Sequence, residues 1–123
     1  MVHYIDYWRE WLGKRWKSPI RVIIHQCWED GNHVENSLHY TGKAVDLRLE
    51  EEKEDGWRII DVIDQWMLAE MVDLFRGIGL YPFWHNPGLH LDIRKIPARW
   101  VKWSGTGYRE LNAKIIKVIC DIY

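Results

Sequence analysis

Two short segments with alternating side chains constrain the fold of this chain more than any other feature of its sequence. Residues 44–49 and 89–94 carry an apolar side chain at every second position. Alternation with a period of two is typical of a β-strand that packs one face on a core and leaves the other face polar. The polar positions hold Asp46 in the first segment, and His90 and Asp92 in the second. The pattern therefore predicts two strands that present carboxylate and imidazole groups.

A further polar residue, His39, precedes Asp46 by seven positions. Gly42 lies between them and tolerates backbone angles that other residues avoid, so the chain can bend there and bring both side chains to one point. Catalytic zinc takes three protein ligands with nitrogen or oxygen donors and leaves a fourth position for water. The sequence therefore predicts a Zn²⁺ site formed by His39, Asp46 and His90.

Three motifs surround these residues. Residues 37–46 read Ser-x-His-x-x-Gly-x-Ala-x-Asp, residues 90–94 read His-x-Asp-x-Arg, and residues 78–82 read Ile-Gly-Leu-Tyr-Pro. The combination resembles the zinc D-Ala-D-Ala carboxypeptidase and endopeptidase family, whose members are peptidoglycan peptidases and include phage endolysins. The resemblance covers about residues 18–108, which is most of a small domain.

The resemblance has implications for both site and fold. It implies that His39, Asp46 and His90 bind zinc, and that the protein hydrolyses peptide bonds next to D-amino acids in peptidoglycan stem peptides. It also implies a fold that is shared with hedgehog signalling domains, in which zinc can be retained without peptidase activity.

One departure from the family pattern concerns the general base. Many members place an acid three residues before the second histidine, where this chain has Pro87. A general base must stand within hydrogen-bond reach of the attacking water, which leaves His85 and Asp92 as candidates. His85 is preferred, because Asp92 could instead hold His90 in place or pair with Arg48 or Arg94.

A second departure concerns substrate recognition. The family's strand end Ser-Gly-Tyr-Arg is replaced by His-Gln-Cys-Trp at residues 25–28, so a substrate-facing arginine is missing there. Together with Pro87, this favours an alternative function: a non-catalytic, zinc-binding module that recognises muropeptides, or a structural phage component. The complete ligand set favours the enzyme.

Tryptophan is unusually abundant, with nine residues in the chain. Most of them are expected to fill the core, since large aromatic side chains dominate cores and binding surfaces. Trp28 and Trp84 flank the presumed site and are predicted to form walls for the substrate. Ser37 is expected to contact the substrate too, because the same polar loop carries Ser37 and His39.

The remaining apolar spacing indicates the fold class. It predicts helices over residues 3–16, 63–76 and 111–122, short strands over residues 20–25 and 78–81, and a hairpin over residues 100–108. The charged run at residues 50–56 is predicted to be a solvated turn. We therefore expect one α+β domain over residues 1–123, with a small, mainly antiparallel sheet and helices packed on one face.

Composition limits the partners and the location. A net charge of −1 gives no basic surface for nucleic acid. No apolar run approaches the ~20 residues of a membrane span. The charged amino terminus does not resemble a signal peptide, so we expect synthesis in the cytoplasm and action on a cell wall only after phage-type release. The sequence does not set an oligomeric state, and we expect a monomer.

Overall fold

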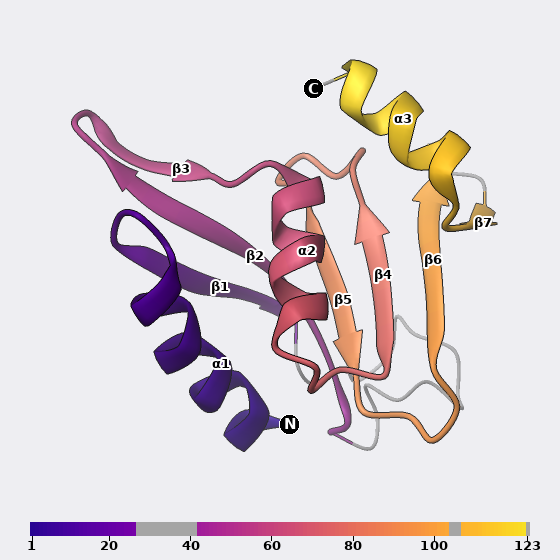
Figure 1. The fold of residues 1–123 in the computed structure, drawn as a ribbon, viewed down its shortest axis with the longest axis horizontal. Helices are drawn as coiled ribbons and strands as arrows, with labels where there is room; N and C mark the ends of the chain where they lie inside the picture. The colour runs from indigo at the N-terminus through magenta and orange to yellow at the C-terminus, as the bar shows by residue number, and fades with distance from the viewer. Residues whose placement is uncertain (27–41, 104–106, 123) are drawn as a thin grey trace.

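The computed structural model describes residues 1–26, 42–103 and 107–122 (Figure 1). In this part of the chain the helices are α1 (Val2–Arg15), α2 (Val62–Met71) and α3 (Ala113–Ile122). The strands are β1 (Ile20–Gln26), β2 (Ala44–Lys53), β3 (Gly56–Ile59), β4 (Gly77–Tyr81), β5 (Gly88–Asp92), β6 (Ala98–Trp103) and β7 (Gly107–Glu110).

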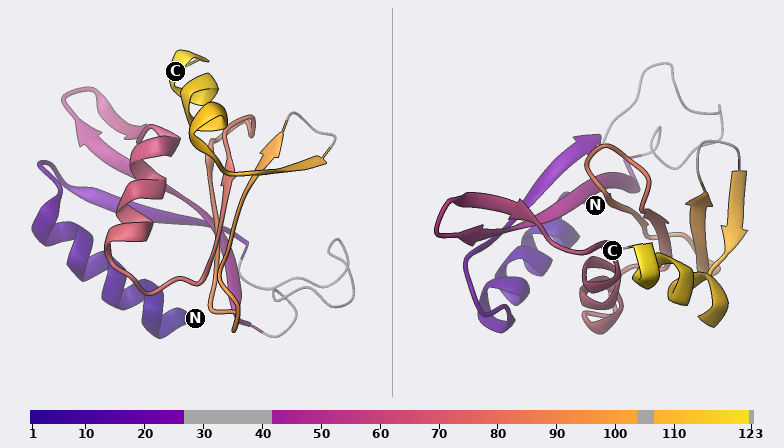
Figure 2. Two further views of the ribbon diagram at one scale, coloured as in Figure 1. Left: turned by 45° about the vertical axis from the view of Figure 1, so that its right-hand side comes forward. Right: turned by 90° about the horizontal axis from the view of Figure 1, so that it is seen from above.

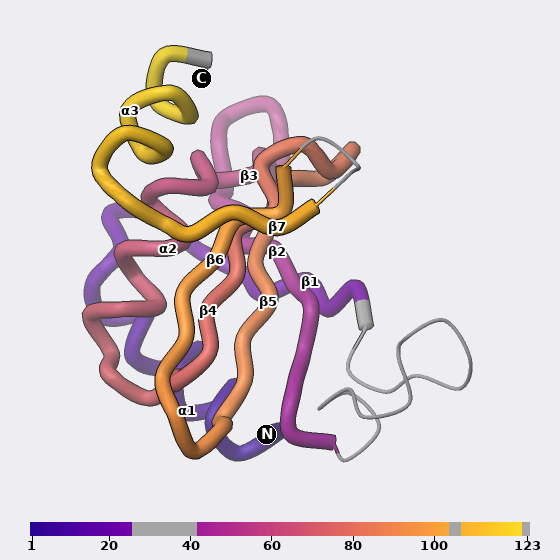
Figure 3. The backbone as a smooth tube through the Cα atoms, turned by 90° about the vertical axis from the view of Figure 1, so that its right-hand side faces the viewer, coloured from indigo at the N-terminus to yellow at the C-terminus, as the bar shows by residue number. Residues whose placement is uncertain are grey.

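The strands form one sheet in the order β1-β2-β5-β4-β6-β7, and β3 pairs with one end of β2. Neighbouring strands are antiparallel except β4 and β6, which are parallel. The predicted α+β class with a mainly antiparallel sheet is therefore confirmed. Strand β5 lies between β2 and β4 (Figure 3), which brings the two alternating segments together although they are far apart in sequence.

The helices lie on one face of the sheet, as predicted (Figure 2). The apolar positions of the central strands face these helices and are fully or almost fully buried: Val45, Leu47, Leu49, Ile78, Leu80, Leu89, Leu91 and Val101. Because a slip of one residue would turn every one of these side chains to the opposite face, their burial fixes the register of the strands. The polar positions of the same strands consequently lie on the face away from the helices. No helix in the described ranges is long and apolar enough to span a membrane.

Only part of the charged run at residues 50–56 is the solvated turn that the sequence predicts: residues 54–55 form an exposed turn, whereas residues 50–53 belong to β2. Strand β2 continues to Lys53 and pairs with β3 across a tight turn. Glu50 is only 6% exposed. Its carboxylate accepts hydrogen bonds from Arg21 on β1 and Arg48 on β2. A run of charged residues usually forms a solvated loop. Here the positive charges of Arg21 and Arg48 allow the Glu50 carboxylate to be buried within the sheet.

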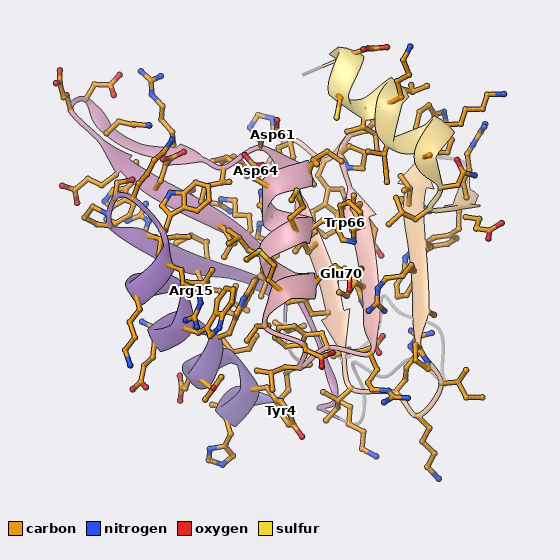
Figure 4. The ribbon with its side chains drawn as sticks, in the orientation of Figure 1. Tyr4, Arg15, Asp61, Asp64, Trp66 and Glu70 are labelled. Atoms are coloured by element: carbon orange, nitrogen blue, oxygen red, sulfur yellow. The ribbon has the colours of Figure 1, made fainter. Side chains whose placement is uncertain are left out.

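Helix α2 is shorter than predicted. It begins after Asp61, whose side chain accepts a hydrogen bond from the backbone N–H of Ile63, and it ends at Met71 instead of Arg76. Figure 4 shows Asp61 at one end of the helix and Glu70 towards the other. Phe75 lies beyond the helix and packs edge-on against Trp8 of α1, with ring centroids 5.3 Å apart. The apolar spacing correctly predicted that Phe75 is a core residue, but Phe75 lies in a non-helical segment after α2.

Gln65 of α2 is a fully buried polar residue that connects the helix to β2 and to the turn before β5. Its side-chain carbonyl accepts a hydrogen bond from the backbone N–H of Leu49 at 3.0 Å. Its amide donates to the backbone carbonyls of Ile60 at 2.7 Å and Pro87 at 3.1 Å. Gln65 therefore ties α2 to β2 and to the turn that leads into β5.

Replacing Gln65 with leucine is expected to lower the free energy of unfolding by about 3 kcal/mol, because two buried backbone groups, at Leu49 and Ile60, lose their partner and each costs about 1–3 kcal/mol when unpaired. Denaturant unfolding of Gln65→Leu against wild type measures this. Met67→Leu, at an exposed position of the same helix, is the matched control and should change stability by less than about 0.5 kcal/mol. Equal midpoints for all three proteins would contradict the prediction.

Candidate metal centre

The structure brings Asp46 and His90 together on the face away from the helices. They are direct partners in the register of β2 and β5. Each residue is 8% exposed. The His90 Nδ1 atom lies 3.1 Å from Oδ1 of Asp46. Two of the three predicted zinc ligands therefore meet through strand pairing, although 44 positions separate them in the sequence.

Asp92 holds the other side of the His90 ring. Its Oδ2 atom lies 2.8 Å from His90 Nε2. Arg94 donates to both carboxylate oxygens through Nε, at 2.8 and 3.0 Å, and to Oδ2 through Nη2, at 2.6 Å. Burial alone would raise the pKa of Asp92, but the hydrogen bonds from His90 and Arg94 hold it well below its usual range. Asp92 therefore remains a carboxylate and fixes the orientation of the imidazole.

An imidazole ring between two carboxylates is stable only when each of its two nitrogen atoms carries a proton or a metal ion. If Nε2 donates its proton to Asp92, the lone pair of Nδ1 in a neutral ring would face the Asp46 carboxylate, which is unfavourable. A proton or a metal ion between Nδ1 and Asp46 removes this conflict. Consistent with this, burial alone would lower the pKa of His90, but its hydrogen bonds to Asp46 and Asp92 raise it overall.

The same two atoms are within hydrogen-bond distance of one another, and their spacing can be compared with that of two zinc ligands. Two ligand atoms bound at about 2.1 Å to a tetrahedral zinc lie about 3.4 Å from one another, close to the 3.1 Å between His90 Nδ1 and Asp46 Oδ1. Within the described residues, no group of three histidine, cysteine or acidic side chains forms a complete metal site. The third predicted ligand, His39, lies outside the described residues.

Two glycines of β4 make room for the side chains around this pair. Asp46, His90, Gly79 and Trp100 form one row across the four strands β2, β5, β4 and β6. A Cβ atom on Gly79 would lie 2.4 Å from the Trp100 ring. Because that position has no side chain, Trp100 packs beside His90, with ring centroids 5.0 Å apart. In the next row, Gly77 leaves room for Asp92.

The segment between β4 and β5 supplies an aromatic wall. Trp84, a predicted substrate wall, is half-buried and stacks on Tyr81 with ring centroids 4.1 Å apart. Its ring also packs against the His25 ring, with centroids 5.1 Å apart. Burial, and then the negative charge of Asp46, raise the pKa of Tyr81, so its hydroxyl stays protonated at neutral pH. His85, the predicted general base, is exposed on the same segment.

Two residues on this face were not predicted as site residues: His25, and Arg48, which was considered only as a possible partner of Asp92. Arg48 follows Asp46 by two positions in the same alternating strand, and its Nη1 atom lies 2.9 Å from Nε2 of His25. Burial and the positive charge of Arg48 lower the pKa of His25, so this ring is neutral. The signal was available for Arg48, because residues two apart in a strand share a face. Of the predicted substrate contacts, Ser37 and Trp28 lie outside the described residues.

Comparison with known proteins supports the fold. No solved structure matches the chain. Residues 4–64, just under half of the chain, match the sequence model of the Hedgehog amino-terminal signalling domain. The matched segment runs from α1 into α2 and contains Asp46, whereas His90 lies beyond it. The part of the chain from α1 into α2 is therefore similar in sequence to the Hedgehog amino-terminal signalling domain.

Proposed function

We propose that this protein binds zinc through His39, Asp46 and His90 and hydrolyses peptide bonds next to D-amino acids in peptidoglycan stem peptides. The contact between His90 Nδ1 and Asp46 Oδ1 is the observation that carries the proposal. It presents a nitrogen and an oxygen donor at the spacing of two zinc ligands, and Asp92 occupies the other ring nitrogen. The spacing of His39 and Asp46 in the sequence supports His39 as the third ligand.

The residues around the pair have separate roles in this proposal. Zinc bound there would polarise the scissile carbonyl and lower the pKa of its water to about 7. Asp92 and Arg94 keep the His90 ring in the orientation that turns Nδ1 towards Asp46. Trp84 forms one wall for the substrate, and its stacking on Tyr81 limits its movement.

His85 is proposed as the general base in place of the acid that Pro87 replaces. Both oxygens of Asp92 already accept hydrogen bonds, from His90 and Arg94, which supports a positioning role for Asp92. His85 is exposed and lies on the segment that leads into β5, so it has the freedom to approach a bound substrate. The His85→Ala variant should keep its zinc and lose turnover.

A second candidate function is zinc binding without turnover, in a module that recognises muropeptides. Two observations favour it. Pro87 cannot accept a proton, and the family that matches residues 4–64 is described as a signalling domain and not as a peptidase. The two candidates share the metal site and differ only in catalysis.

Metal analysis followed by a peptidoglycan assay tests these functions. The purified protein is expected to hold one zinc ion per chain, and to release D-alanine or cut cross-links when incubated with peptidoglycan. Chelation and His39→Ala should each abolish cleavage, since each removes the ion or one of its ligands. Bound zinc without any cleavage would favour the recognition module, whereas a protein that binds no zinc would refute both.

A further inference from the structure

The Tyr81 side chain lies on the same face of the sheet as the Asp46–His90 pair. Tyr81 follows Gly79 by two positions in β4, and Gly79 is the partner of His90 in β5, so Tyr81 shares the face of His90. Neighbouring strands lie about 4.8 Å apart and two residues of a strand span about 6.6 Å, which sets the Cα atoms of Tyr81 and His90 about 8 Å apart. A tyrosine side chain covers most of that distance. After burial, the negative charge of Asp46 is the next cause that raises the pKa of Tyr81, so the two side chains are near one another.

Two tryptophans fix the position of the Tyr81 ring. Trp84 stacks on it, with ring planes 18° apart and centroids 4.1 Å apart. Trp100 of β6 occupies the space beside Gly79 that a Cβ atom would fill, and it forms a side-chain hydrogen bond with Tyr81. Because the indole N–H is a donor only, the Tyr81 oxygen is the acceptor of this bond. The Tyr81 hydroxyl is therefore oriented before any ligand binds.

The hydroxyl proton of Tyr81 has no acceptor within the described part of the chain. A tyrosine hydroxyl both donates and accepts, and here only its acceptor side is used, by Trp100. The side chain is half-buried, and a polar group that is removed from water usually finds a hydrogen-bond partner within the protein. The Tyr81 proton is therefore available to a ligand that binds at Asp46 and His90.

We propose that Tyr81 is a catalytic residue that donates a hydrogen bond to the carbonyl oxygen of the scissile bond as that oxygen becomes negatively charged. This rests on the proposed function. When water attacks the carbonyl carbon, a C–O bond forms, the π electron pair moves to the carbonyl oxygen, and one proton of the water passes to His85. When the C–N bond breaks, the carbonyl re-forms, the proton on His85 passes to the leaving nitrogen, and the second proton of the water stays on the new carboxyl group. Tyr81 keeps its own proton, and its hydrogen bond is stronger to the oxyanion than to the neutral carbonyl.

The Tyr81→Phe variant tests the proposal, because it removes the hydroxyl and keeps the ring that stacks on Trp84. Its kcat should fall by about 100-fold while KM changes little, since the lost hydrogen bond forms only in the transition state. Tyr7→Phe is the matched control. Tyr7 is 58% exposed on α1, on the opposite face of the sheet, and its loss of a hydroxyl should leave both constants unchanged.

A binding measurement provides a readout that does not depend on turnover. A phosphinate analogue of N-acetyl-D-Ala-D-Ala replaces the planar scissile amide by a tetrahedral, negatively charged group. Calorimetric titration of the zinc-loaded proteins should show that Tyr81→Phe loses at least about tenfold in affinity for the phosphinate and keeps its affinity for the planar peptide. Tyr7→Phe should bind both ligands as wild type does.

The outcomes separate this proposal from the proposed function. Cleavage by wild type together with an unchanged kcat and phosphinate affinity in Tyr81→Phe would retain the peptidase and overturn the role of Tyr81. Equal losses of affinity for the phosphinate and the planar peptide would show that Tyr81 is only structural, which also overturns it. A selective loss of phosphinate affinity in Tyr81→Phe, without cleavage by wild type, would retain the hydrogen bond from Tyr81 and reject the peptidase.

Discussion

The His90→Ala variant is expected to lose zinc binding almost completely. The change removes Nδ1, the ligand atom that lies 3.1 Å from Oδ1 of Asp46. Strand β5 would then no longer place a second ligand opposite Asp46. Loss of an outer hydrogen-bond partner of a ligand typically weakens metal affinity by about 10- to 100-fold, so loss of the ligand itself should exceed 100-fold. Competition against a chromophoric chelator measures the affinity.

Asp92→Asn is the graded comparison for that variant. It keeps the size of the side chain and leaves the proposed ligand atoms, His90 Nδ1 and Asp46 Oδ1, in place. It weakens the hydrogen bond that orients the His90 ring and the ion pair with Arg94. Its zinc affinity should fall by about 10- to 100-fold, between wild type and His90→Ala. Circular dichroism should show all three proteins folded. If His90→Ala bound zinc as tightly as wild type, His90 would not be a ligand.

The Gly77→Ala variant is expected to lose about 3 kcal/mol of stability and to lose zinc affinity at the same time. A Cβ atom at this position would lie 2.1 Å from Oδ1 of Asp92 and 2.3 Å from its Cγ and Oδ2 atoms. Asp92 is fully buried, so its carboxylate cannot move aside without breaking its bonds to His90 and Arg94. Overpacking costs about 1–3 kcal/mol, and disruption of a buried ion pair adds to this.

Gly13→Ala is the matched control for Gly77→Ala. Gly13 lies within α1, and a Cβ atom there would meet nothing within 4 Å. Alanine is favoured over glycine inside a helix by about 1 kcal/mol, so this variant should be slightly more stable than wild type. Thermal unfolding and zinc titration of both variants measure the contrast. A Gly77→Ala protein with wild-type stability would show that Asp92 can be displaced at little cost.

Much of the sheet could be predicted from local pattern. The alternation at residues 44–49 and 89–94 identified two strands and the correct polar face of each. Helical spacing identified α1 and α3 to within about two residues, as expected for helix ends. These elements could be predicted because the direction of a side chain in a strand or helix depends only on its position within a short repeat.

Other elements depended on partners distant in sequence. The run at residues 50–56 forms the predicted exposed turn only at residues 54–55, because Glu50 is buried in β2 between Arg21 of the neighbouring strand and Arg48 of its own strand. The end of α2 was misplaced because Phe75 is buried against Trp8 of α1 and not against its own helix. Local hydrophobicity predicts burial, and it does not say which element provides the covering surface.

The amino-acid sequence by itself determined which residues could reach a polar face: Asp46 in one alternating strand, and His90 and Asp92 in another. Only the tertiary structure decided that β5 inserts beside β2 in the register that sets Asp46 opposite His90. It also decided that Asp92 holds the ring and pairs with Arg94, and that Arg48 joins the same surface. The physical reason is that a repeat of two residues fixes the face of a side chain, whereas strand order and register are fixed by burial of the whole core.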